Sequence, residues 1–157
     1  MNKLVIRLSE LVGVVCLIAF IIFVSSEREV SKADPELISQ QVYSAVNTDG
    51  LTKRNSLFFK NKYKINTDSF EYLLCYSSDS VMDVRELIVI KLGSESYKST
   101  EEAIREVLSQ KQKLYDSYAP EQSALLNSAV LVYEKGYLLL AIGEDAQNAL
   151  TAFRNSL

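Results

Sequence analysis

The sequence predicts an α+β fold in which a single N-terminal transmembrane helix precedes a small domain with an antiparallel sheet of about four strands and helices packed on it. An uncharged apolar run occupies residues 11–24. Helical spacing of apolar residues is clearest at about 99–118 and at 146–157. Short runs of β-branched, leucine and aromatic residues, typical of strands, occupy residues 69–77, 84–92, 129–133 and 137–142. From residue 69 the order is therefore strand, strand, helix, strand, strand, helix.

The N-terminal segment has the pattern of a membrane anchor. Lys3 and Arg7 precede the apolar run, which reaches 17 residues when it is counted from Leu8 to residue 24. A membrane-spanning helix needs about 20 residues, and positive charges before it favour a cytoplasmic N-terminus. We therefore expect residues 1–26 to be a retained single-pass signal-anchor in the cell membrane. A cleaved signal peptide and a buried core helix are the alternatives.

A short linker, residues 27–33, is expected to lead into one extracytoplasmic domain, residues 34–157. Asp34 followed by Pro35 is typical of an N-cap and the first helical position. Apolar residues at helical spacing follow, and a second short helix is expected over about 55–62.

The longest helix is expected to begin near Ser99. Ser99 with Glu102 three residues later forms a capping box. The apolar residues that follow share one helical face, and the charged residues, Lys111 among them, are expected to point mostly away from it.

The last two strands are expected to form a hairpin across a three-residue loop, with Gly136 in a left-handed conformation. If Tyr133 pairs with Tyr137, one face carries Leu131, Tyr133, Tyr137, Leu139 and Ala141, and the other carries Val130, Val132, Leu138, Leu140 and Ile142. Because both faces are apolar, both should be covered, one by the two long helices and the other by the N-terminal helices or a partner.

The composition excludes several kinds of active site. The chain contains no histidine, which removes histidine-based triads, histidine general bases and the usual zinc sites. It also lacks a glycine-rich phosphate loop and a CxxC pair. Cys75 is expected to be a small buried strand residue, since a nucleophilic role would need a cation or a helix terminus nearby. We expect no catalytic residue, cofactor or metal site, and no nucleic-acid partner for an acidic domain outside the cell.

The junction between the last strand and the last helix carries two adjacent acids, Glu144 and Asp145. Acids at a helix start complement the helix dipole and accept backbone N–H bonds, so capping is the expected role. The alternative is a cation site or a general base, but no third ligand is recognisable.

Glu86 lies at the start of the most apolar strand, residues 84–92. We expect it to pair with Arg85 or Arg105, or to lie at a sheet edge where a charge prevents aggregation. A catalytic role is the alternative.

A basic and aromatic stretch, KRNSLFFKNKYK, occupies residues 53–64. One interpretation is contact with an anionic surface such as lipid headgroups or wall polymers. The other is a solvated helix face with Leu57 and Phe58 in the core. The basic residues concerned are Lys53, Arg54, Lys60, Lys62 and Lys64.

Several features from residue 85 onward occur together in one order: RELIVIKL, a charged amphipathic helix, YAPEQSALL, and a strand that ends in IGEDA. In these features the chain resembles an uncharacterised bacterial family, domain of unknown function 4358, over roughly residues 36–157. The resemblance implies an extracytoplasmic domain on a lipoprotein or single-span protein, an association with surface polysaccharide genes, and no assigned activity. Cys16 lacks the lipoprotein cysteine box, which favours a single span. The residues that carry the resemblance are Glu86, Tyr118, Pro120, Tyr137, Ile142, Gly143, Glu144, Asp145 and Phe153.

The sequence therefore predicts a non-catalytic interaction or accessory module at the bacterial cell surface, with a protein or a cell-envelope polymer as partner. The alternative is a small carboxylate-dependent hydrolase or transferase that acts on cell-envelope polymer. This alternative requires two acids to converge in one cleft.

Overall fold

The computed structural model describes residues 12–18, 30–92 and 97–157, and the chain divides into two units, Met1–Val30 and Ser31–Leu157. In the first unit residues 12–18 are helical with exposed side chains. None of the described helices has the length and apolar character that crossing a membrane requires. Most of the predicted anchor lies outside the described residues, so the anchor stays a prediction.

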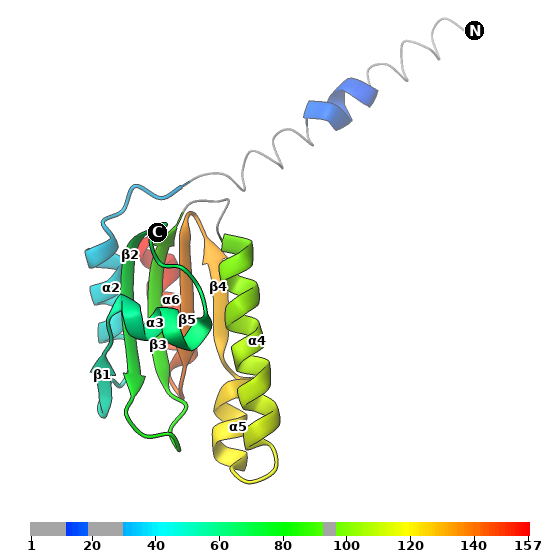
Figure 1. Ribbon diagram of the computed structural model, residues 1–157. Helices are drawn as coiled ribbons and strands as arrows, with labels where there is room; N and C mark the ends of the chain where they lie inside the picture. The colour runs from blue at the N-terminus through cyan, green and yellow to red at the C-terminus, as the bar shows by residue number, and fades with distance from the viewer. Residues whose placement is uncertain (1–11, 19–29, 93–96) are drawn as a thin grey trace, which may run out of the picture. The chain divides into compact units, whose positions relative to one another are not determined.

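The second unit is built on an antiparallel sheet, five-stranded over the described residues, in the order β1-β2-β3-β5-β4 (Figure 1). The α+β class and the strands expected from the sequence are confirmed. The three-residue edge strand β1 was not predicted, because three residues are too few to show an alternating pattern. The strands are β1 Leu51–Lys53, β2 Phe70–Ser78, β3 Glu86–Leu92, β4 Val130–Glu134 and β5 Tyr137–Ile142.

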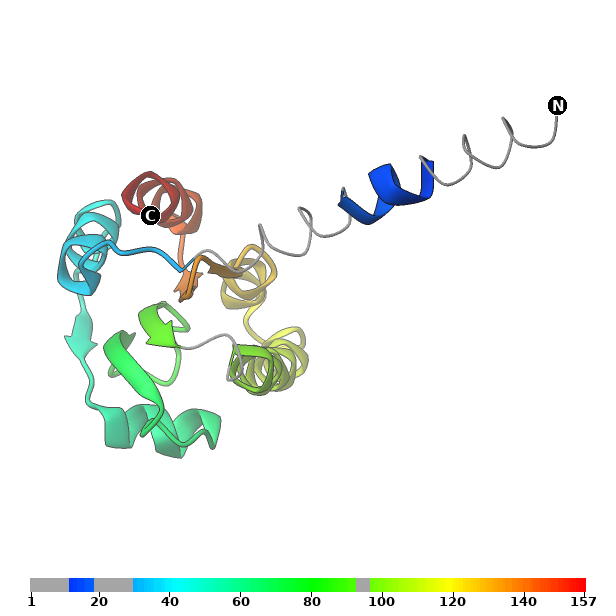
Figure 2. The same cartoon turned by 90° about the horizontal axis from the view of Figure 1, so that it is seen from above.

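Helices cover both faces of this sheet, as Figure 2 shows from above. Helices α3, α4 and α5 pack on one face, and α2 and α6 pack on the other. The two longest helices, α4 and α6, were expected on one face and in fact lie on opposite faces, because each apolar face of the sheet needs its own cover. The helices are α2 Pro35–Ser44, α3 Ser56–Tyr63, α4 Tyr97–Tyr115, α5 Pro120–Asn127 and α6 Ala146–Ser156.

The predicted N-terminal cap is present in α2 but not in α4. The Asp34 carboxylate accepts the Glu36 N–H at 2.9 Å, which confirms the expected cap of α2. Helix α4 already includes Tyr97, so Ser99 lies within its first turn and is not the cap that the capping box predicts.

The hairpin register differs from the expected one by a single residue. Glu134, and not Tyr133, pairs with Tyr137, which leaves a two-residue turn of Lys135 and Gly136. Both turn residues have positive φ, 47° and 88°, as a type I′ turn requires. The sequence rule misses this turn because lysine rarely adopts the left-handed conformation.

The shift of register moves the two tyrosines to opposite faces of the sheet. Tyr133 stacks on Tyr97 of α4 with ring centroids 4.1 Å apart. Tyr137 is buried on the α2 and α6 face, where its hydroxyl donates to the Ala33 carbonyl at 2.8 Å. Ser31 also donates to the Lys135 carbonyl, so the compact unit includes residues that the sequence assigned to the linker.

Candidate functional site

Glu86 is a buried carboxylate at the start of the central strand β3. Strand alternation places it with Ile88 and Ile90 on the face covered by α3, α4 and α5, and its side chain is 0% exposed. Strand β3 lies between β2 and β5, so the expectation of a sheet edge is wrong. A carboxylate removed from water costs several kcal/mol unless charged or polar groups compensate it.

The groups that compensate Glu86 are two lysines from two helices. Lys62 of α3 places its Nζ 2.6 Å from Glu86 Oε2, and Lys111 of α4 places its Nζ 3.9 Å from the same oxygen. Their side chains are only 19% and 25% exposed. The expected partners are engaged elsewhere, since Arg85 pairs with Asp83 and Arg105 pairs with Glu101.

Lys111 was expected to point away from the apolar face of its helix, and that expectation is wrong. It lies seven residues after Ile104 and four before Tyr115, which are both buried. This spacing puts Lys111 on the buried face, since residues four and seven apart share a helical face. The spacing of Lys111 from Ile104 and Tyr115 therefore indicated its buried position, but a charged residue in a helix is readily taken to face solvent.

Burial changes the acid–base properties of the groups around Glu86. Removal from water, followed by the neighbouring Lys62 ammonium, lowers the pKa of Lys111 to about 8, against the opposing effect of Glu86. Burial and the Glu86 charge raise the pKa of the Cys75 thiol to about 12 and that of Tyr63 well above its usual value. Cys75 is thus a buried thiol that stays protonated at neutral pH, which is the structural role expected for it.

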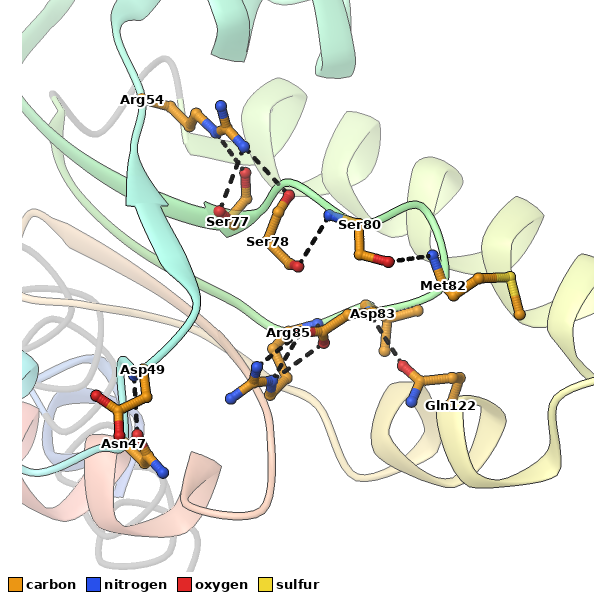
Figure 3. Close-up of polar contacts among 11 residues, drawn as sticks. Asn47, Asp49, Arg54, Ser77, Ser78, Ser80, Met82, Asp83, Arg85 and Gln122 are labelled. Atoms are coloured by element: carbon orange, nitrogen blue, oxygen red, sulfur yellow. Dashed lines mark hydrogen bonds and ion pairs between the residues drawn. The ribbon is translucent and has the colours of Figure 1, made fainter.

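The Lys62 and Lys111 side chains line a pocket of about 480 Å³. Arg54 forms another part of its wall, where its Nε donates to Ser77 Oγ at 2.9 Å (Figure 3). Its guanidinium also forms an ion pair with Asp79. The Arg54 guanidinium also lies 4.8 Å from the centre of the Phe58 ring. The pocket is thus basic and partly aromatic. Its lining also includes Ser78, Ser80, Val81, Asp83, Val84, Arg85 and Tyr115.

The loop between β2 and β3 closes one side of this pocket and is held at several points. Arg85 makes a bidentate ion pair with Asp83, and the Val84 N–H donates to the Gln122 side chain of α5 at 2.9 Å (Figure 3). The Tyr115 hydroxyl of α4 donates to the Val81 carbonyl. These contacts fix the loop to two helices on the same side of the sheet.

The basic stretch at residues 53–64 divides into two groups. Arg54 and Lys62 turn toward the pocket, whereas Lys53, Lys60 and Lys64 are exposed. The buried residues of α3 are Phe59 and Tyr63, and Phe58 packs partly buried against the same core cluster, so the interpretation that placed Leu57 and Phe58 in the core is right only in part. Leu57 is 61% exposed.

The acidic junction lines a different cavity from the lysine pair, and the lining of that cavity also includes Asp83, Arg85 and Glu86. Asp145 is the N-cap residue of α6, but its φ of −92° and ψ of 13° differ from the extended cap geometry and it makes no capping bond. Its carboxylate instead accepts the Asn47 N–H and the Asn148 amide, each at 3.1 Å. The expected capping bond is therefore absent, and Asp145 ties the segment after α2 to the start of α6. Glu144 beside it is exposed.

The described residues contain no cluster of three or more acidic or cysteine side chains that is arranged to hold a metal ion. Fold and site together define a small α+β domain with an ion-paired, buried carboxylate next to a cation-lined pocket. A family model described as "Domain of unknown function (DUF4358)" matches residues 44–143, and the chain belongs to this family. The resemblance noted in the sequence is thereby confirmed. The matched region contains Arg54, Lys62, Glu86 and Lys111 and ends before α6.

No curated protein and no solved structure shows a detectable match to this chain.

Proposed function

We propose that this protein is a non-catalytic binding or accessory module, held at the outer face of a bacterial cell membrane by its N-terminal segment. The partner is a protein or a polymer of the cell envelope. The membrane and the outer location rest on the charge pattern around Lys3, Arg7 and the apolar run.

The observation that supports a binding role is the state of Glu86. A general acid, a general base or a nucleophile has to reach the substrate, within about 3 Å of the reacting atom. The Glu86 side chain is 0% exposed and its Oε2 is 2.6 Å from Lys62. The acids on the pocket wall, Asp79 and Asp83, are paired with Arg54 and Arg85. These ion pairs fix the shape and charge of the lysine-lined pocket and engage the carboxylates on its wall.

A pull-down from intact membranes tests this proposal. Photo-crosslinking groups placed in the full-length protein at the exposed Val81, which lines the pocket, and at Met82 next to it should capture a defined partner. The same group at Gln147 on α6, on the opposite face of the sheet, is the control and should not capture it.

The enzyme alternative is tested with the same full-length protein in neutral detergent. Incubation with isolated cell-envelope polymer should leave the polymer unchanged. Cleavage or group transfer that is lost in Glu86→Gln would overturn the non-catalytic proposal and favour a carboxylate-dependent hydrolase or transferase.

A further inference from the structure

The charges around Glu86 do not balance. Lys62 and Lys111 both approach the same carboxylate oxygen, at 2.6 and 3.9 Å. The remaining charged residues on the pocket wall form matched pairs, Arg54 with Asp79 and Arg85 with Asp83. Among the described residues around the pocket, the lysine pair therefore brings one positive charge more than its carboxylate compensates.

This excess charge lies in a partly desolvated position, where it is costly. The low pKa of Lys111, about 8, reflects that cost, because burial and the Lys62 ammonium both favour the neutral form of the Lys111 amine. At pH 7, which is below this pKa, the Lys111 ammonium is the prevailing form. A group that supplies the missing negative charge would stabilise both ammonium groups together.

We propose that the pocket beside Lys62 and Lys111 binds a singly charged oxyanion, a phosphodiester or a carboxylate, that is carried on a larger molecule. An excess of one positive charge matches a monoanion better than a dianionic phosphate monoester. Ammonium groups are suited to compact oxyanions as point charges, whereas the planar Arg54 fork is already occupied by Ser77 and Asp79. A volume of about 480 Å³ exceeds that of the bare ion and admits the group to which it is attached. The Val81 and Val84 side chains on the lining offer an apolar surface for that group.

The inference rests on the proposed function in that the pocket binds its ligand without converting it. Lys111 is the main contact, because Lys62 is committed to Glu86 at 2.6 Å. Lys62 of α3 and Glu86 of β3 act directly on Lys111. Tyr63 of α3 and Cys75 of β2 lie around Glu86. The other titratable residues on the pocket lining are Arg54, Asp79, Asp83, Arg85 and Tyr115.

The test is isothermal titration of the full-length protein in neutral detergent with two anionic probes and one neutral probe. The probes are glycerophosphoglycerol, glucuronate and methyl glucoside. Saturable binding of either anion, without binding of the neutral sugar, is the expected result and identifies which oxyanion the pocket takes. Equal binding of methyl glucoside, or no saturable binding of either anion to folded protein, would overturn the inference.

Two variants on α4 make the test specific. Lys111→Gln should weaken anion binding about tenfold or more, because it removes a charge-assisted contact. Lys113→Gln removes the same charge from an exposed position of the same helix and should leave binding unchanged. An equal loss in both variants would contradict the assignment and indicate only long-range attraction. A thermal melt of each variant checks that it is folded.

The pH dependence separates a ligand contact from a structural role. Wild-type affinity for the anion should fall between pH 7 and pH 9 as Lys111 loses its proton, and Lys111→Gln should show little of this fall. Turnover of the phosphodiester would overturn the proposed non-catalytic function but would still support an anion site at Lys62 and Lys111. Absence of anion binding, together with capture of a membrane partner, would overturn the anion site but would still support the non-catalytic binding function.

Discussion

Lys62 Nζ lies 2.6 Å from Glu86 Oε2, and this contact permits a carboxylate to be buried in the central strand of the sheet. Removal of one member of a buried pair leaves an uncompensated charge, which costs more than the pair contributes as a whole. Lys62→Met should therefore destabilise the domain by about 3 kcal/mol, at the low end of the usual range because Lys111 remains near. Urea unfolding followed by circular dichroism measures the change.

The matched control for Lys62→Met is Lys60→Met, since Lys60 is an exposed residue of the same helix. Its effect should stay within about 0.5 kcal/mol. Similar losses in the two variants would mean that the Lys62–Glu86 contact does not stabilise the buried carboxylate.

The stability of the domain should depend on pH through Lys111. Its folded-state pKa, about 8, lies below the value near 10.5 of an ordinary lysine, so the unfolded chain holds more protons in the interval between them. Stability should therefore rise with pH from about 8 to 10 through this group. Other lysines and tyrosines titrate in the same range, so the quantity to measure is the difference between wild type and Lys111→Met. A difference that stays flat across the interval would contradict the low pKa.

The β4–β5 turn offers a stabilising substitution. Lys135 has a φ of 47°, a conformation that asparagine adopts at lower cost than lysine, and Asn-Gly is the preferred type I′ pair. Lys135→Asn should stabilise the domain by about 0.5–1 kcal/mol and keep the bond from Ser31, which uses the backbone carbonyl. Thermal and urea unfolding check this, and a loss of stability would argue for the three-residue loop predicted from sequence.

The acidic junction should act on stability only modestly. Asp145→Ala removes the acceptor of the Asn47 N–H and should cost about 0.5–1.5 kcal/mol, whereas Asp145→Asn retains an acceptor and should cost less. Phe153→Ala should cost about 3–5 kcal/mol, because the ring is fully buried between α6 and the sheet. If Glu144→Ala or Asp145→Ala left stability intact and abolished partner capture, the junction would be a binding site.

Membrane topology can be tested directly in protoplasts. Residues from about Glu27 onward should be accessible to added protease while the chain sediments with the membrane, because Lys3 and Arg7 precede the apolar run. Protection of the domain, or its release into the medium with a new N-terminus, would exclude a retained anchor with an outer domain.

Local patterns in the sequence predict much of this fold, and long-range relationships set the rest. Three features depend only on residues that are close together in the sequence, and could therefore be predicted from it. They are the positions of the longer strands, the cap at Asp34 and the apolar character of both faces of the sheet. The hairpin register depends on Lys135 adopting a rare conformation, and a one-residue error exchanges the two faces. The partners of Glu86 could not be read, because α3 and α4 bring them from positions 24 residues before and 25 residues after it.

The placement of residues 31–33 has a practical consequence for handling the protein. Ser31 Oγ donates to the Leu157 carbonyl at 3.0 Å, so the first and last residues of the compact unit meet. They lie by the β4–β5 turn, where Tyr137 pairs with Lys91 (Figure 1). Glu86 lies at the other end of β3, about 17 Å along the strand from Lys91 at about 3.3 Å per residue. A C-terminal affinity tag, or a surface to which that tag is attached, would thus leave the lysine-lined pocket facing free solution.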